Sequence, residues 1–299
     1  MAAVYAAARA RLIDTLMRDT APGGGWGYFA GKASRLEPTL WALAALAHTP
    51  DLPRPFADIA APHLQYLEHA QQSDGLLRDA PRMPANLASN GLAVVVLSAV
   101  APEKTIVLDR LRAALTGVKG LRVTNEPGAV QNNELQAWPW LPGTFSWVEP
   151  TAWCVLALKR SPTSLASAAR VSEAEAMLRD RQCTGGGWNY GNASVLGQDL
   201  RPYVPTTAAG VLALQDQAST PDAGKALAWL ESARLSELST MALSLAALAL
   251  HICGRPVDDV LQHVADGVQR TAERGNLHHQ AMALCALTLD VHSGLVFRV

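Results

Sequence analysis

Two glutamates, Glu37 and Glu149, occupy the same short motif, Glu-Pro-Thr. The second has apolar neighbours, because Trp147 and Trp153 flank it and Phe145 lies four residues before it. A carboxylic acid held among apolar side chains keeps its proton to higher pH, and such an acid can protonate an alkene. A structural interpretation competes, since Pro fits the first turn of a helix and Glu faces the positive end of the helix dipole. Two copies of the motif favour the structural role for Glu37, whereas Glu149 stays open between structure and catalysis.

Four further candidates stand in segments that are otherwise apolar. Trp41 and Trp153 hold equivalent positions in two such segments. Their ring faces could stabilise a carbocation by cation–π attraction, or the rings could simply pack. Asn86 and Asn90 interrupt a third segment. A buried amide costs free energy unless it is hydrogen-bonded, so these two either bridge to loops or face a wet cavity.

Three more candidates, Tyr203, His278 and His279, lie near the start of apolar segments. The histidines could line a cavity as polar groups, and the alternative is a solvent-facing place at a helix start. We include all three, together with Trp147, among the residues expected to contact a substrate.

The glutamates belong to a longer motif that occurs twice. Residues 26–39 read WGYFAGKASRLEPT and residues 138–151 read WPWLPGTFSWVEPT. In each copy Trp comes first, then an aromatic residue, Gly, Ser and Glu-Pro-Thr at identical spacing. A third, looser copy begins at Trp188 and has additional residues before its Pro-Thr. Matches at this many spaced positions indicate a repeat protein. We expect the first Trp of each copy to be buried between neighbouring repeats.

Two kinds of helix alternate along the chain. One kind carries a single apolar stripe, as at 107–118 and 257–268, and the other is apolar almost all round. The second kind covers residues 39–47, 87–100, 151–158, 206–214, 239–252 and 279–289. Pairing the two kinds gives six hairpins that begin near residues 2, 56, 104, 171, 222 and 256, a spacing typical of helical-pair repeats.

This alternation predicts an all-α fold of the α/α-toroid type. A helix that is apolar on every side must be covered on every side, which a closed ring achieves with the apolar helices inside. An open solenoid would need polar capping repeats, and neither end of the chain has that character. We expect one toroid domain over residues 1–299, with both termini close together and almost no sheet.

Composition sets further limits. With 49% hydrophobic and 17% charged residues, the 299-residue chain can bury a large core. The net charge of −1 without a basic cluster argues against nucleic acid as a partner. The four cysteines stand apart, which suits a reducing compartment and provides no zinc cluster. The first residues make a poor signal peptide. We therefore expect a cytoplasmic protein, and leave a peripheral membrane contact open.

The Gly-rich loops resemble a known family. Gln182 ahead of Gly187-Trp188 looks like the QW-type repeats of squalene–hopene cyclases, and the overall pattern resembles the prenyltransferase/squalene-cyclase repeat group. The resemblance extends over nearly the whole chain in the spacing of the helical hairpins, and it is specific in three loops, 23–39, 136–151 and 182–207. It implies an α/α toroid with a hydrophobic, isoprenoid-type small molecule as its partner. Cyclases of this group usually carry a second such domain, for which this chain has no room.

The catalytic signatures of that family are altered here. Its cyclases carry the proton donor in an Asp-x-Asp-Asp-Thr stretch that opens an inner helix. The corresponding stretch, 147–151, has Glu149 in place of the central acid and Pro in place of its neighbour. In the protein prenyltransferases, zinc is held by Asp, Cys and His; His279 matches the His, but Leu238 and Thr240 replace the other ligands. One histidine does not hold zinc. We expect no metal and no cofactor.

Three functions fit these observations. The first is an isoprenoid-processing enzyme that closes an apolar ring on a hydrocarbon chain, with Glu149 as the acid for a cyclisation. The second is a non-catalytic toroid that binds a lipid or a protein partner. The third is a sugar-processing (α/α) barrel with Glu37 and Glu149 as paired carboxylates. The apolar inner helices favour the first over the third. In a ring, the helix starts meet at one mouth, so Glu37, Glu149, Tyr203, Asn86 and His279 should surround a single apolar cavity.

Overall fold

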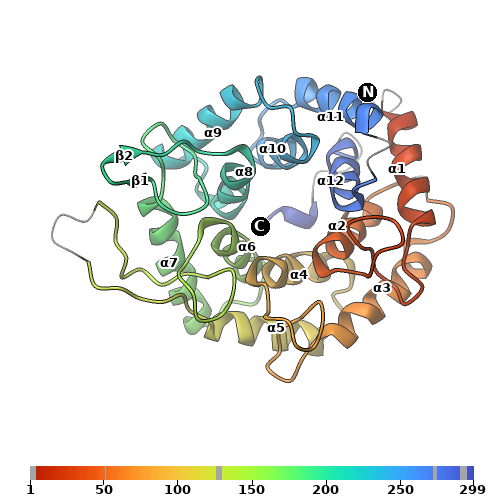
Figure 1. The fold of residues 1–299 in the computed structure, drawn as a ribbon, viewed down its shortest axis with the longest axis horizontal. Helices are drawn as coiled ribbons and strands as arrows, with labels where there is room; N and C mark the ends of the chain where they lie inside the picture. The colour runs from red at the N-terminus through yellow and green to blue at the C-terminus, as the bar shows by residue number, and fades with distance from the viewer. Residues whose placement is uncertain (1–4, 51, 126–129, 272–274, 290–294) are drawn as a thin grey trace.

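In the computed structural model, the residues that the structure describes include twelve α-helices, which form a closed double ring (Figure 1). The structure describes residues 5–50, 52–125, 130–271, 275–289 and 295–299. The outer ring consists of α1 (Ala6–Arg18), α3 (Phe56–Ala70), α5 (Thr105–Gly117), α7 (Leu165–Asp180), α9 (Pro221–Ala233) and α11 (Asp258–Thr271). The inner ring consists of α2 (Leu36–Ala47), α4 (Leu87–Val100), α6 (Val148–Lys159), α8 (Val204–Ala213), α10 (Thr240–Ile252) and α12 (Leu277–Leu287).

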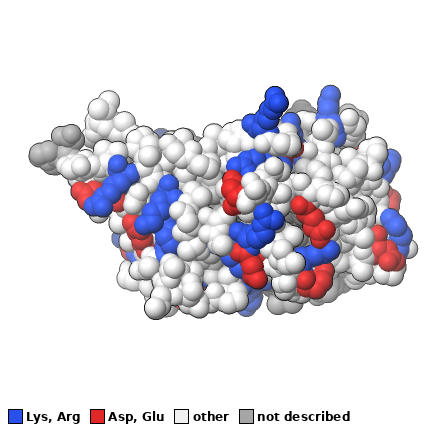
Figure 2. Space-filling view, turned by 90° about the horizontal axis from the view of Figure 1, so that it is seen from below, with Lys and Arg blue, Asp and Glu red and all other residues white. Residues whose placement is uncertain are grey.

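The inner helices close the ring by contact with one another. Each packs against the next in the order α2, α4, α6, α8, α10, α12, and α12 packs against α2 and α1. The inner helices bury nearly every residue, whereas an outer helix such as α5 buries one stripe, Leu108, Leu111 and Leu115. Charged residues of both signs are interspersed over the outer wall (Figure 2). The predicted α/α toroid is thus confirmed.

One hairpin start differs from the prediction, and another lies outside the described residues. The fourth hairpin begins at Leu165 rather than near residue 171, because Ser164 and Ser167 form a reciprocal capping box. A serine stands there where Glu or Gln is usual, which hid the helix start in the sequence. The expected start near residue 2 lies outside the described residues, and the first described helix begins at Ala6.

The three loop tryptophans, Trp26, Trp138 and Trp188, are completely buried, as predicted. Each indole N–H donates to a carbonyl near the end of the preceding outer helix: Trp26 to Leu16 (2.7 Å), Trp138 to Leu115 (2.8 Å) and Trp188 to Leu178 (2.6 Å). Each main-chain N–H of these tryptophans donates to a threonine hydroxyl of the next inner helix, on Thr39, Thr151 or Thr207. The spacing from Trp to Thr in the repeat therefore has a structural origin.

Neighbouring hairpins also meet over these rings. His63 of α3 lies on Trp26 with ring centroids 3.8 Å apart, and its Nδ1 accepts a hydrogen bond from the Gly25 N–H. The guanidinium of Arg170, on α7, lies 4.3 Å from the Trp138 ring. Trp26 and Trp138 thus join their hairpins to the next hairpin in the chain.

The centre of the ring is occupied by the chain itself. A 3₁₀ turn, η2 (Leu295–Phe297), lies in the middle of the inner helices (Figure 1). Val296 and Phe297 are each only 2% exposed. The expectation that the two ends of the chain lie close together involves residues 1–4, which are outside the described residues; of the described ends, α1 is on the outer ring and the apolar pair 296–297 is buried in the lumen.

Sheet is limited, in the described residues, to one hairpin of two-residue strands and a few isolated bridges. β1 (Ser194–Val195) pairs antiparallel with β2 (Gln198–Asp199), and the turn between them places Leu196 at φ 51°. Among the described helices, none combines the length and apolar character needed to cross a bilayer.

Candidate active site at the mouth of the ring

The two Glu-Pro-Thr motifs open α2 and α6 at the same end of the ring, as expected. In each, an extended residue precedes the helix, and its main-chain N–H donates back to the loop tryptophan: Arg35 to Trp26 and Trp147 to Trp138. These bonds fix where the helix starts. They place Glu37 and Glu149 in the first turn of their helices, at the mouth formed by the inner-helix N-termini.

The carboxyl of Glu149 has a raised pKa. Burial raises the pKa of its carboxyl to about 7, the charge of Glu37 adds to the rise, and a hydrogen bond with the Trp153 side chain opposes it. Roughly half of such carboxyls keep the proton at neutral pH. Burial raises the pKa of Tyr190, and the charge of Glu149 adds to this rise. The Tyr190 hydroxyl therefore lies in the same electrostatic environment as Glu149.

Glu37 lies in a small polar cluster. It accepts a hydrogen bond from the Tyr28 hydroxyl at 2.5 Å, and its other oxygen is 3.7 Å from Nε2 of His278. Burial and the Glu37 charge raise the pKa of Tyr28, so this hydroxyl stays a donor. Burial lowers the pKa of His278, which favours the neutral ring at pH 7 although the Glu37 charge opposes that shift. Glu37 is therefore held by the hydrogen bond from Tyr28, with the His278 ring beside it.

Aromatic side chains line the ring below the two carboxyls. Trp41 and Trp153 meet edge to face with centroids 5.9 Å apart, and Trp41 lies 6.4 Å from His278. Gly91 lets α4 approach α6 closely at this level, since a Cβ there would lie 2.7 Å from the carbonyl carbon of Trp153. The two expected aromatic residues do face the lumen.

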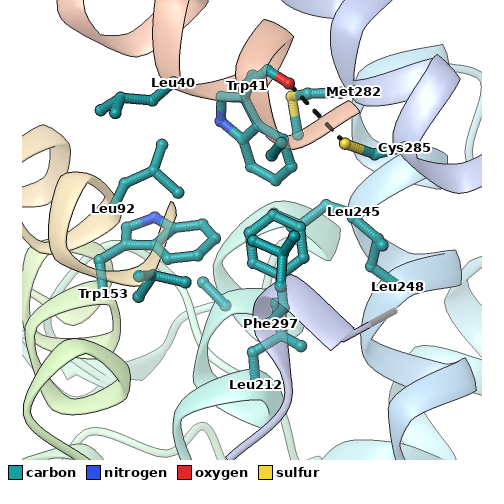
Figure 3. Packing of buried hydrophobic residues seen from close by; sticks show 14 of the residues in the cluster. Leu40, Trp41, Leu92, Trp153, Leu212, Leu245, Leu248, Met282, Cys285 and Phe297 are labelled. Atoms are coloured by element: carbon teal, nitrogen blue, oxygen red, sulfur yellow. Dashed lines mark hydrogen bonds between the residues drawn. The ribbon is translucent and has the colours of Figure 1, made fainter. Parts of the chain in front are cut away.

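The lumen is filled at its centre, which corrects the expectation of one open apolar cavity. The Phe297 ring lies 5.1 Å from Trp41 and 6.2 Å from Trp153 (Figure 3). Next to Phe297, a cavity of about 20 Å³ is left, lined by residues that include His48, Leu248 and Cys285. That space is large enough for one water molecule and too small for a hydrocarbon chain.

The predicted asparagines use their amides within the protein. Asn86 caps α4 by accepting a hydrogen bond from the Ser89 N–H. Asn90 is fully buried, and its side chain bonds both main-chain groups of Leu77 and the carbonyl of Asn86. Of the two alternatives for these amides, Asn90 therefore takes the bridge to a loop.

The other predicted residues lie around the mouth or outside it. Tyr203 is 51% exposed and pairs with Tyr190, their centroids 5.5 Å apart. Trp147 packs over Gly191 and lines a separate cleft of about 310 Å³. His279 is exposed and lines another cleft, of about 470 Å³, between α10 and α12.

Sequence reasoning missed three residues of this site: Tyr28, Tyr190 and Phe297. Tyr28 had a signal, because it is the aromatic residue that follows Trp26 by two positions in the repeat. Tyr190 follows Trp188 at the same spacing. Phe297 has no counterpart in the repeat, and only the structure reveals its position.

Metal ligands are not gathered anywhere in the described part of the chain. No group of three or more His, Cys, Asp or Glu side chains lies close enough together there to hold an ion. The free cysteines Cys154 and Cys285 are buried in the ring, and burial raises the pKa of both thiols.

The fold and the mouth define a class, the α/α toroids. Among solved structures, the chain is similar to the type II terpene cyclase MstE from Scytonema, with 15% identity over 96% of this chain and 98% of that chain and a TM-score of 0.65. An MstE variant in complex with geranylgeranyl dihydroxybenzoate, its substrate, has 14% identity over 97% of each chain and a TM-score of 0.62. A family 76 glycoside hydrolase from a bovine Bacteroides thetaiotaomicron strain has 10% identity over 94% of this chain and 76% of that chain, with a TM-score of 0.61. Neither a protein-family model nor a curated protein matches the sequence. At these identities, the similarity establishes the fold.

Proposed function

We propose that this protein is a terpene-cyclase-like enzyme that takes an isoprenoid chain into its ring and starts a cyclisation with the proton of Glu149. The observation that carries the proposal is the raised pKa of Glu149, about 7, at the edge of an aromatic lumen. Protonation of an alkene needs an acid that is neutral yet ready to release its proton. Trp41 and Trp153 would then face the cationic carbons.

The two glutamates have different roles in this proposal. Glu37, held by Tyr28 and close to His278, stays in place and raises the pKa of Glu149 through its charge. Two carboxyls whose surroundings differ in this way are typical of acid chemistry. The toroid fold shared with a cyclase that binds a geranylgeranyl substrate adds support.

The filled centre favours a second candidate, a toroid that binds a lipid or protein partner without catalysis. Phe297 occupies the space that a hydrocarbon chain would need. The sugar-processing alternative has a toroid neighbour but less support from the walls, because aromatic and aliphatic side chains surround the lumen (Figure 3). A polar wall would be expected for that substrate.

The test is conversion of candidate substrates. Purified protein is incubated with squalene, geranylgeraniol and geranylgeranyl dihydroxybenzoate, and products are identified by mass spectrometry. Glu149→Gln should lower the rate by about 10²–10⁴-fold, as for loss of a general acid. The matched control, Glu103→Gln, removes an exposed carboxyl in the connection between α4 and α5, at the end of α4 opposite the mouth, and should leave the rate unchanged. Conversion that survives Glu149→Gln, or binding without conversion by the wild type, would reject the proposed role of the acid.

A peripheral membrane contact at the mouth would suit an isoprenoid substrate. Of the large apolar side chains exposed in the described residues, all but Ile106, Leu165 and Val299 lie on loops that lead into inner helices. The most exposed of these are Leu196 at the tip of the β hairpin and Leu238. Sedimentation with phosphatidylcholine vesicles should decrease in a Leu196→Ser/Leu238→Ser variant and not in Ile106→Ser.

A further inference from the structure

The segment 295–299 occupies the lumen, and hydrogen bonds to the main chain of residues 297–299 hold it there. Gln215, just after α8, donates from Nε2 to the Phe297 carbonyl at 2.8 Å and accepts at Oε1 from the Val299 N–H at 3.0 Å. Arg160, just after α6, donates to the Arg298 carbonyl. Both anchors follow the C-terminal ends of inner helices, so they lie opposite the mouth that carries Glu149.

The part of the segment that reaches toward the mouth is held by apolar contact. The Phe297 ring lies among Trp41, Trp153, Leu212 and Leu245, side chains of four different inner helices (Figure 3). Phe297 thus fills the level of the ring where the proposed substrate would meet the two tryptophans. A dry apolar space of this kind, when vacated, binds apolar molecules of benzene size or larger.

We propose that residues 295–299 are a displaceable plug that competes with the apolar ligand for the lumen. This inference rests on the proposed function, since it concerns the same site. A ligand that needs the lumen can bind only the fraction of molecules in which the segment has moved away, and its apparent affinity falls by that fraction. The anchors are side-chain contacts with the main chain of 297–299, so their loss breaks no main-chain hydrogen bond of the inner helices.

Three variants distinguish the effect of the plug on binding from the effect of the residues that line the lumen. Phe297→Ala removes the ring that occupies the lumen. Gln215→Ala removes two anchors of the segment and leaves the lumen wall intact. Arg298→Ala is the matched control, because its side chain is exposed and its carbonyl keeps the bond from Arg160.

Binding of geranylgeraniol is measured by calorimetry and by the change in total tryptophan fluorescence, with circular dichroism to check the fold. Phe297→Ala and Gln215→Ala should each bind at least about 10-fold more tightly than the wild type. This is the gain in affinity when the state with an empty lumen, populated in about a tenth or less of the wild-type molecules, becomes the dominant state. Arg298→Ala should bind like the wild type. A peptide with the sequence Leu-Val-Phe-Arg-Val, added in excess to a chain shortened after residue 294, should weaken binding again.

The outcomes distinguish the two proposals. Equal affinity in the wild type, Phe297→Ala and Gln215→Ala, all folded, would overturn the plug and leave the ligand site standing. Failure of every folded variant to bind geranylgeraniol, squalene or geranylgeranyl dihydroxybenzoate would overturn the proposed function and the plug with it. If Phe297→Ala does not fold, Gln215→Ala and the peptide competition still decide the question.

Discussion

Replacing Glu149 by Gln should change how the stability of the protein depends on pH. The carboxyl has its pKa raised from 4.5 to about 7, chiefly by burial and then by the charge of Glu37. Between these two pH values the folded protein holds a proton that the unfolded chain has already released. The free energy of unfolding therefore falls as pH rises through this window. Glutamine has the shape of the protonated acid and does not titrate, so the variant lacks this loss.

The size of the effect follows from the shift. A rise of the pKa from 4.5 to about 7 corresponds to about 3 kcal/mol at most, since one pKa unit is about 1.4 kcal/mol. The side chain keeps some solvent contact, which screens its charge and lowers the expected effect to about 1–3 kcal/mol. Below pH 4.5 both proteins carry a neutral group at position 149, and their stabilities should be nearly equal.

Urea unfolding of both proteins at several pH values from 4.5 to 8.5 measures this difference. Glu149→Gln should become more stable relative to the wild type by about 1–3 kcal/mol across the window. Other groups titrate alike in both proteins and largely cancel in the difference. Glu103→Gln, which removes an exposed carboxyl, should show no such trend. A difference between Glu149→Gln and wild type that does not change with pH would refute the assignment of a neutral carboxyl at this site.

Further predictions concern the loops that hold the mouth. Trp26→Ala, Trp138→Ala and Trp188→Ala should each cost about 3–5 kcal/mol in urea unfolding, because each removes a fully buried ring and leaves a carbonyl without its donor; Trp147→Ala, at a ring 37% exposed, should cost clearly less. Burial, with a smaller effect of Arg54, lowers the pKa of His63 to about 4, so the wild type should lose stability as pH falls from 6.5 toward 4, and this loss should be absent in His63→Asn. Asn90→Ala should cost about 1–3 kcal/mol, because the Leu77 N–H loses its acceptor in a buried place; an equal stability would show that this amide bridge contributes nothing.

The ring itself could be predicted from the sequence because its cause is local and repeated. Segments apolar on every side, such as 87–100 and 239–252, must be enclosed, and the Trp-to-Thr motif occurs in two loops at identical spacing and in a third with additional residues. The burial of Trp26 follows from the same repeat. The sequence singles out Glu149 because its neighbours in the chain are apolar, and Glu37, whose charge adds to the rise of its pKa, stands at the same position in another copy.

The rest of the site depends on contacts between distant parts of the chain. A position just before a helix places Trp147 at the mouth but does not fix which way its ring points, and it packs over Gly191 instead of facing the lumen. The aromatic neighbours of Phe297, Trp41 and Trp153, are 256 and 144 residues away in the sequence, on helices that meet only when the ring closes. No local pattern distinguishes such a phenylalanine from one on the surface.

The plug and the acid are connected through one side chain, which gives a final prediction. The Trp153 indole interacts with the Glu149 carboxyl on one side and packs against Phe297 on the other. Phe297 thus helps to exclude water from the lumen side of the Glu149 carboxyl. With Phe297→Ala, water should enter the lumen, and the pKa of Glu149 should fall from about 7 toward its ordinary value, because desolvation is the main cause of the rise.

Comparison of Glu149→Gln with its parent, in the Phe297→Ala background, measures this pKa. The window in which the two stabilities diverge should move to lower pH, and saturating geranylgeraniol should move it back by excluding water again. The acid would then be prepared for proton transfer when the lumen is filled, by the plug or by a ligand, and would be ionised when it is empty. An unchanged window in the Phe297→Ala background would mean that Trp153 and the helix start alone desolvate Glu149, and the connection would be rejected.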